Sequence, residues 1–265
     1  MPDFFLSAGG GAAPFAFIAL AALRVAAALM TTPVFQAASM PASVRVLLVA
    51  ALAMLLAAGS PGSIQEWDGW GSFVAAAFAE LALGATLGLG VALAFAAFCV
   101  AGQILDVQLG FGMAQIVDPV TRRPVPIVTT AFERVGVLVF LLLDGHHALL
   151  RGLQYSIDRL PVGAGWSAAT GAEAILDQVG GIFSLGFALA APVAFCTMLV
   201  EFLLGVIGRN LPQMNMFAVG FQVKIIAGLV ALALWFSGIG GVMARVYASI
   251  AATWSAIFAA AGQGR

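Results

Sequence analysis

The chain has 265 residues, of which 62% are hydrophobic and 9% are charged, and its formal net charge is −1. Soluble domains carry about 25% charged residues, so this composition excludes an ordinary soluble protein and predicts an integral membrane protein. With one lysine and no basic tail, the chain also lacks the electrostatic footprint of a nucleic-acid-binding protein.

Six apolar runs follow one another along the chain, and a membrane-spanning helix needs about 20 apolar residues. The second run is barely long enough to cross a bilayer, and the third is far longer than needed. Pro192 lies inside the fifth run and predicts a kink or a break there. The sequence therefore predicts a single all-α membrane domain over residues 1–265, with about six long helices, some broken or strongly tilted. The runs are Ala12–Met30, Val44–Ala58, Phe73–Ala101, Ile127–Leu143, Ile182–Ile207 and Met216–Met243.

The connections between the runs differ in character. Gly59–Ser72 contains two tryptophans and is typical of an aqueous loop with interfacial anchors, and Leu149–Leu160 is an amphipathic stretch. Residues 246–265 form a moderately amphipathic tail, in which we expect Tyr247, at the start of the tail, and Trp254 to lie at the membrane interface. The arginines divide equally between the two sides of such a bundle, so charge does not predict its orientation.

Nearly every apolar run carries an ionisable residue where a membrane span should have none. A charge that faces lipid at the bilayer centre costs about 3 kcal/mol on insertion scales. These residues therefore predict partners inside the fold, partners on other subunits, or a watery lumen. Glu201 is the candidate partner of Lys224, because the two lie at comparable depth on either side of a tight turn; a partner on another subunit is the alternative. The residues are Arg24, Glu80, Glu133, Arg134, Glu201 and Lys224.

A polar segment between the third and fourth runs reads DVQLGFGMAQIVDP over residues 106–119. Gly110 and Gly112 flank Phe111, and Met113 follows. Glycine permits unusual backbone conformations, and Phe and Met are bulky enough to form a movable apolar stopper in a pore. The alternative is a re-entrant or interfacial loop with a buried Phe anchor.

A second distinctive segment reads LPQMNMFAVGFQVKI over residues 211–225. Pro212 ends one helix, and Asn215 is a plausible N-cap for the next. The side chains of Gln213 and Asn215 can satisfy exposed backbone groups at the tip of a helical hairpin.

The remaining reactive side chains do not assemble into a catalytic constellation. Cys99 and Cys196 lie inside apolar runs and offer neither a disulfide framework nor zinc spacing. His146 and His147 could take part in a metal site or a proton relay, but too few ligands converge, so an interfacial polar cluster with Asp144 is favoured. The sequence thus predicts no cofactor, no metal and no enzymatic activity. A single GxxxG pattern, Gly84–Gly88, is unremarkable among 31 glycines.

Four segments together resemble the FliR family of flagellar export proteins, called SctT in the injectisome branch. They are LPQMNMFAVGFQVKI (211–225), LGFGMAQIVDP (109–119), RVAAALMTTPVFQAASMPASVRV (24–46) and LVFLLLDGHHALLRGLQYSIDRLPVG (138–163). They occur in the family's order and span almost the whole chain. Gln222 departs from the Pro or Leu of many family members.

The resemblance implies a place in the core of the type III export gate, within a hetero-oligomeric helical assembly that contains FliP and FliQ subunits and a pore. Residues 1–180 would be the FliP-like part, residues 181–245 the FliQ-like hairpin and residues 246–265 an amphipathic tail. The family's pore-blocking loop maps onto Gly110, Phe111, Gly112 and Met113. FlhB and unfolded export substrates are the further expected partners, in the bacterial inner membrane at the flagellar basal body.

We therefore expect a non-enzymatic subunit of the flagellar export channel. The segment MNMFAVGFQVKI looks flagellar, and an injectisome subunit is the alternative. A secondary transporter with Glu80, Glu201 and Lys224 as an ion or proton relay is a further alternative. An inverted-repeat transporter should show matching broken helices in its two halves, and the run Val44–Ala58 has no internal proline to match Pro192.

Overall fold

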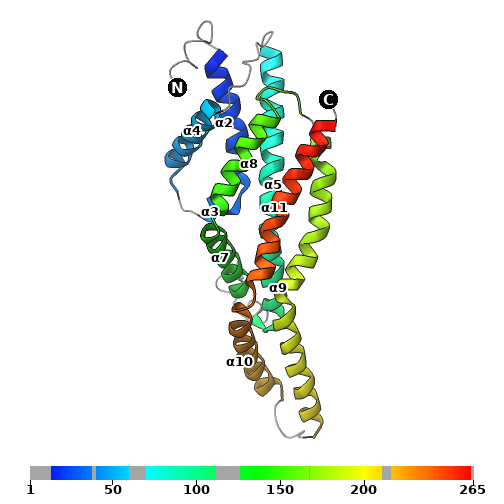
Figure 1. The fold of residues 1–265 in the computed structure, drawn as a ribbon. Helices are drawn as coiled ribbons and strands as arrows, with labels where there is room; N and C mark the ends of the chain where they lie inside the picture. The colour runs from blue at the N-terminus through cyan, green and yellow to red at the C-terminus, as the bar shows by residue number, and fades with distance from the viewer. Residues whose placement is uncertain are drawn as a thin grey trace. The chain divides into compact units, whose positions relative to one another are not determined.

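The computed structural model describes residues 13–37, 40–59, 70–111, 126–166, 168–210 and 216–263. These residues form α-helices (Figure 1), and no β-strand occurs among them, which confirms the all-α class. The helices are α2 (Ala13–Thr31), α3 (Pro33–Ala37), α4 (Ala42–Gly59), α5 (Trp70–Gln108), α7 (Ile127–Leu142), α8 (Gly145–Arg159), α9 (Ala168–Asn210), α10 (Met216–Phe236) and α11 (Gly240–Gln263).

Five helical stretches within these ranges are long and apolar enough to cross a membrane. They are Ala42–Gly59, Trp70–Gln108, Gly171–Asn210, Val219–Phe236 and Gly240–Gly262. Phe15–Thr31 is a shorter apolar helix. A bilayer core leaves no water for unpaired backbone groups, so continuous helices are the structure that such apolar runs must adopt.

The last apolar run is not one helix, contrary to the prediction from hydropathy. Helix α10 ends at Phe236, a turn follows, and α11 begins at Gly240. In the turn, the Ser237 N–H donates to the Leu234 carbonyl at 3.4 Å and the Gly238 N–H to the Trp235 carbonyl at 2.9 Å. Glycine is a weaker helix former than every other residue except proline, and Gly238 and Gly240 lie at this break, although the run is apolar throughout.

Pro192 lies inside α9, and the 43-residue helix continues through it. Proline has no N–H, so the carbonyl of Ala188, four residues earlier, loses its helical donor. The indole N–H of Trp235 on α10 donates to the neighbouring carbonyl of Leu189 at 2.9 Å. This hydrogen bond goes to the carbonyl one residue after Ala188, so it does not replace the donor that Pro192 removes, but it fixes α10 beside α9.

The chain divides into two compact units, each with its own apolar core. The first comprises Met1–Leu93, Phe140–Gln178 and Ser249–Arg265, and the second Ala94–Val139 and Val179–Ala248. Fully buried side chains of the first unit include Leu20, Leu29, Leu83, Leu87 and Leu153, and those of the second include Phe98, Leu105, Leu109, Leu189 and Val193.

Two glycines bring α2 and α5 into close contact in the first unit. A Cβ atom on Gly84 would overlap the backbone carbonyl of Arg24, and one on Gly88 would overlap the hydroxyl of Thr31. Small residues let apolar helices approach each other closely. The GxxxG pattern, which the sequence alone gave no reason to single out, therefore places Arg24 on α2 against α5.

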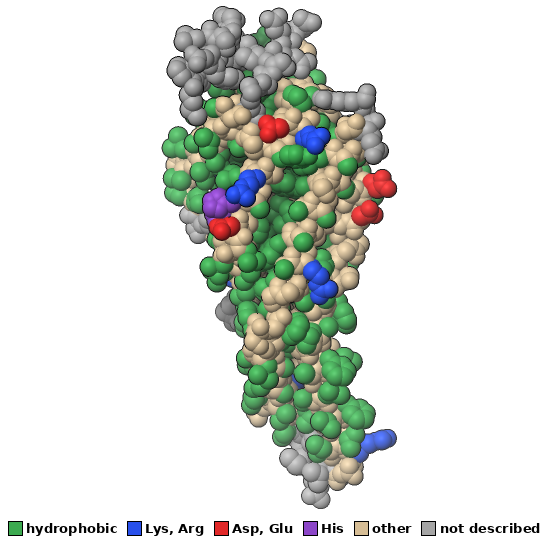
Figure 2. All heavy atoms as spheres, viewed as in Figure 1, with side chains coloured by type: hydrophobic (Ala, Val, Ile, Leu, Met, Phe, Trp, Pro, Cys, Tyr) green, Lys and Arg blue, Asp and Glu red, His purple; other side chains and the backbone are tan. Residues whose placement is uncertain are grey.

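Large apolar side chains cover the outer faces of α9 and α10 in the second unit. Figure 2 shows them over much of the visible surface of these two helices, and the exposed ones include Phe195, Phe202 and Ile226. Only 6% of the apolar stretch Val219–Phe236 is buried within the chain. Exposed apolar surface of this extent needs lipid or other membrane subunits to cover it.

Candidate functional site

Arg24 and Glu80 form a buried ion pair between α2 and α5. Each residue is 1% exposed. The Arg24 Nε donates to Glu80 Oε2 at 2.5 Å, and Nη2 donates to Oε1 at 2.9 Å. Two parallel hydrogen bonds between a guanidinium and a carboxylate are the strongest geometry available to such a pair.

The same pair binds the end of α8. The Nη1 of Arg24 donates to the Ser156 carbonyl at 3.0 Å, and the Gly163 N–H donates to Glu80 Oε1 at 2.9 Å. All three guanidinium nitrogens and both carboxylate oxygens therefore have partners within the chain. A buried charge pair is tolerated when its remaining donors and acceptors are also satisfied, so these two charges do not require another subunit.

Lys224 on α10 pairs with Glu201 on α9, the partner that the sequence singled out. The Lys224 Nζ donates to Glu201 Oε1, and the two helices lie side by side (Figure 1). The Lys224 side chain is 16% exposed and the Glu201 side chain 49% exposed. This carboxylate thus remains half accessible on a helix whose neighbouring side chains are mostly apolar.

The fourth apolar run places its two charges on the surface of the second unit. Glu133 and Arg134 on α7 are both exposed. The Glu133 carboxylate lies close enough to interact with the thiol of Cys99 on α5. Another exposed polar side chain of α5, Gln103, donates to Cys99 Sγ at 3.3 Å. Three polar groups therefore share one surface of an otherwise apolar pair of helices.

The structure describes only part of the glycine-rich segment and of the hairpin tip. Gly110 has φ 83°, a left-handed conformation that favours glycine, and Phe111, which follows it, is half-buried. Gly112 and Met113 lie outside the described residues, as do Pro212, Gln213 and Asn215.

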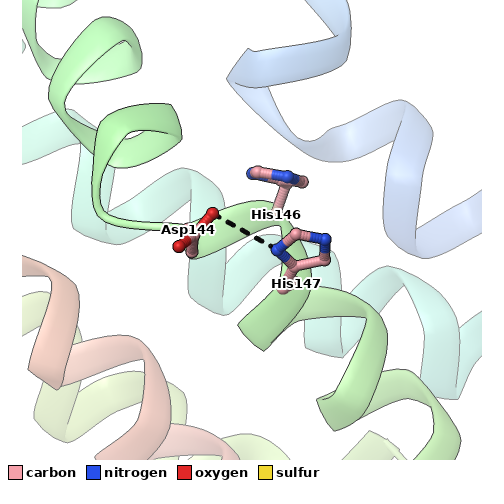
Figure 3. A group of neighbouring side chains, drawn as sticks. All are labelled: Asp144, His146 and His147. Carbon is pink, nitrogen blue, oxygen red and sulfur yellow. Dashed lines mark hydrogen bonds and ion pairs between the residues drawn. The ribbon is translucent and has the colours of Figure 1, made fainter.

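Asp144, His146 and His147 gather at the turn between α7 and α8 (Figure 3). Their potential ligand atoms lie within 4.8 Å of one another. His147 Nδ1 lies 3.3 Å from Asp144 Oδ1, and both side chains are more than half exposed. Asp144 precedes α8 in a left-handed conformation, and its contact with His147 three residues later is typical of a polar helix start, the interpretation favoured from the sequence.

Trp254 and Tyr247 were expected at the membrane interface, and for Trp254 that expectation is wrong. Trp254 is 6% exposed, and its indole N–H donates to the Leu87 carbonyl at 2.9 Å. The Tyr247 hydroxyl donates to the Gly136 carbonyl at 2.7 Å. Buried tyrosine and tryptophan usually find such partners, but sequence does not tell which carbonyl will be in reach.

Sequence reasoning also missed two buried polar residues that join helices. Gln178 on α9 donates to the Gly90 carbonyl at 2.7 Å, and the Asp106 carboxylate receives hydrogen bonds from the start of α7. A polar residue within or beside a long apolar run is the signal that could have indicated both, because burial of an unpaired polar group is unfavourable.

Long apolar helices with internally paired charges define an all-α membrane protein. Residues 15–250 match the family described as bacterial export proteins, family 1. The chain belongs to this family, and the FliR resemblance seen in its motifs is thereby confirmed.

Several curated relatives of this chain carry the name FliR. Flagellar biosynthetic protein FliR of Bacillus subtilis (strain 168) is 29% identical over 245 residues, which cover 91% of this chain and 93% of that relative. The protein of the same name from Escherichia coli (strain K12) is 28% identical over 213 residues, or 80% of each chain. Surface presentation of antigens protein SpaR of Shigella sonnei is 31% identical over 147 residues, or 56% of this chain and 57% of that relative.

Proposed function

We propose that this chain is a subunit of the flagellar type III protein export gate, forming part of the channel through which unfolded flagellar proteins cross the bacterial inner membrane. The observation that carries the proposal is the family match over residues 15–250, together with FliR-named relatives that align over most of their own length. The long apolar helices fit a membrane-embedded export component.

The expected partners are FliP and FliQ subunits within the gate and FlhB at its entrance, at the flagellar basal body. In this scheme residues 1–180 correspond to FliP, residues 181–245 to FliQ, and residues 246–265 form the tail. The antiparallel pairing of α9 with α10, held by Glu201–Lys224 and Trp235–Leu189, supports a hairpin in the second part. The apolar outer face of this hairpin and the exposed Glu201, Glu133 and Arg134 are the surfaces we assign to neighbouring subunits.

The pore-restricting segment of this proposal consists of Gly110, Phe111, Gly112 and Met113. The left-handed Gly110 turns the chain out of the end of α5, directly before Phe111. An aromatic side chain presented in this way can narrow a pore and exclude water. Energy for transport would come from other components, since this chain carries no nucleotide-binding motif.

The geometry of Glu80 argues against the ion-relay alternative. A proton-relay carboxylate must exchange protons along a pathway, whereas both oxygens of Glu80 are engaged by Arg24 and Gly163 in a site that is 1% exposed. The injectisome alternative is favoured by one observation, the likeness to SpaR, which covers 56% of this chain.

A deletion of the gene in its native bacterium tests the flagellar assignment. We expect loss of swimming and loss of secreted flagellar proteins, with recovery when the full-length chain is supplied from a plasmid. Purification of a tagged chain in mild detergent should bring down small multi-span membrane proteins in unequal copy number. Normal swimming combined with loss of a virulence-type secretion activity would transfer the assignment to the injectisome.

The pore-restricting role has a separate test in membranes that contain the assembled complex. Removal of Gly110–Gln115, or Phe111→Ala alone, should increase ion leak across the membrane. Phe78→Ala is the matched control, because Phe78 is an exposed phenylalanine of α5 outside this segment and outside the hairpin. An unchanged leak with intact assembly would refute the plug.

A further inference from the structure

Asp106 joins the end of α5 to the start of α7. The residue is 3% exposed. Its Oδ1 accepts a hydrogen bond from the Val128 N–H at 3.0 Å, and its Oδ2 accepts from the Thr129 N–H at 2.9 Å and from the Thr129 hydroxyl at 2.7 Å. Since α7 begins at Ile127, these N–H groups belong to its first turn, where the helix itself supplies no acceptors.

The carboxylate reaches these donors because α5 has no side chain at position 102. A Cβ atom on Gly102 would overlap the Thr129 Cα atom and lie 2.9 Å from the Thr129 nitrogen and hydroxyl oxygen. The two helices are therefore in backbone contact one turn before Asp106. A negative charge at a helix N-terminus is also favoured by the helix dipole.

The residues that follow Asp106 are held by α10. Leu109 is fully buried, and a Cβ atom on Gly228 would overlap its side chain. A Cβ atom on Gly110 would lie 2.7 Å from the ring of Phe221. The end of α5 is thus fixed by the start of α7 through Asp106 and by α10 through Leu109 and Gly110, and Phe111 is the next residue.

We propose that Asp106 is a positioning residue that sets where Phe111 lies. The inference rests on the proposed pore-restricting role of Phe111 only for its functional consequence. The carboxylate holds three donors of α7 at a point just over one helical turn before Phe111. When that acceptor is lost, the first turn of α7 and the end of α5 separate, and Phe111 is no longer held in one place.

The arrangement requires a carboxylate in particular. Val128 and Thr129 present only donors to Asp106, so both of its oxygens must accept. Asp106→Asn would replace one oxygen by an NH2 group, which faces a donor and leaves it unsatisfied. We therefore expect Asp106→Ala and Asp106→Asn to have large effects, and Thr129→Val, which removes only the hydroxyl donor, to have a smaller one.

The test measures the accessibility of position 111 directly, in membranes containing the assembled complex. Phe111→Cys is introduced into a full-length chain that also carries Cys99→Ala and Cys196→Ala, and its reaction rate with a water-soluble maleimide is recorded. Asp106→Ala should change this rate by about tenfold, because loss of hydrogen bonds to a charged group shifts a local equilibrium by at least that factor. Asp177→Asn, at an exposed acid of α9, is the matched control and should leave the rate unchanged.

Ion leak provides a readout that a merely structural role would not produce. If Asp106 acts through Phe111, Asp106→Ala should add nothing to the leak already caused by Phe111→Ala. An equal maleimide rate in the Asp106→Ala and parent proteins, or additive leaks, would overturn the positioning role. If Phe111→Ala causes no leak at all, the pore-restricting proposal fails, and the maleimide rates alone still decide the role of Asp106.

Discussion

Among the residues that the structure describes, two ion pairs join apolar helices, and they differ in what surrounds them. Arg24 and Glu80 are each 1% exposed, with further hydrogen bonds from Ser156 and Gly163 enclosing them. Lys224 and Glu201 meet through one hydrogen bond, and the Glu201 side chain is 49% exposed. The first pair is complete within the chain, whereas the second presents a carboxylate that can still accept hydrogen bonds from outside.

This difference shows that a charge in an apolar run does not by itself indicate a neighbouring subunit. Arg24 pairs with Glu80 and Lys224 pairs with Glu201 inside the chain, so these four charges give no support to an oligomer by their mere presence. Burial separates the two cases. A fully enclosed pair stabilises the fold of one chain, and a half-exposed pair remains available to a partner.

The largest expected effect comes from breaking the enclosed pair. Arg24→Ala leaves the Glu80 carboxylate buried without its counter-ion, which destabilises a protein by about 3–5 kcal/mol. Thermal melting of the purified chain in detergent should show a large loss, with little change for Arg151→Ala at an exposed arginine of α8. Arg24→Met combined with Glu80→Gln should lose much less than the sum of the single changes. Equal melting of the Arg24→Ala and Arg151→Ala proteins would contradict the comparison.

The glycine contact that positions Arg24 gives the second prediction. Gly88→Ala should destabilise the chain by about 1–3 kcal/mol, because the added methyl group overlaps Thr31. Gly180→Ala places the same group in open space on α9 and should stabilise the helix by up to about 1 kcal/mol. The same melting experiment should show a lower stability for Gly88→Ala and a higher stability for Gly180→Ala, and this opposite direction of change is the critical observation. If both substitutions stabilise the chain, the close approach of α2 and α5 is wrong.

Trp254→Phe tests a neutral hydrogen bond in the same unit as the enclosed pair. The change keeps an aromatic ring but removes the donor to the Leu87 carbonyl, and a neutral hydrogen bond contributes about 1 kcal/mol. We expect a small fall in melting temperature that Trp70→Phe, at a tryptophan 84% exposed, does not produce. A fall as large as that of Arg24→Ala would mean that the ion pair has no special importance.

The smallest effect on the isolated chain should come from the half-exposed pair. Polar contacts between membrane helices average about 0.6 kcal/mol, so Glu201→Gln and Lys224→Gln should change the melting temperature only slightly. If Glu201 contacts a neighbouring subunit, the same variants should release co-purified membrane partners. A large loss of chain stability with unchanged co-purification would place this pair in the same class as Arg24–Glu80.

Parts of the site were predictable from sequence because they depend on local order. Glu201 and Lys224 lie at similar depths on either side of one short turn, so an antiparallel hairpin brings them together. Arg24 and Glu80 are 56 positions apart, and the carboxylate of Asp106 meets Val128 and Thr129, 22 and 23 positions later. Such pairings depend on which helix faces pack, and hydropathy does not contain that information.

The sequence by itself determined the class and the family of this protein. Long apolar runs in lipid must satisfy their backbone groups as helices, and the motifs around Phe111 and Lys224 identify the FliR relatives. Only the tertiary structure decided which charges are enclosed, where the last apolar run breaks, and which groups accept the hydrogen bonds that Trp254 and Thr129 donate. The physical reason is that a side chain's partner is chosen by close packing between distant segments, and a single glycine such as Gly84 or Gly102 can decide whether two helices come close enough for that choice.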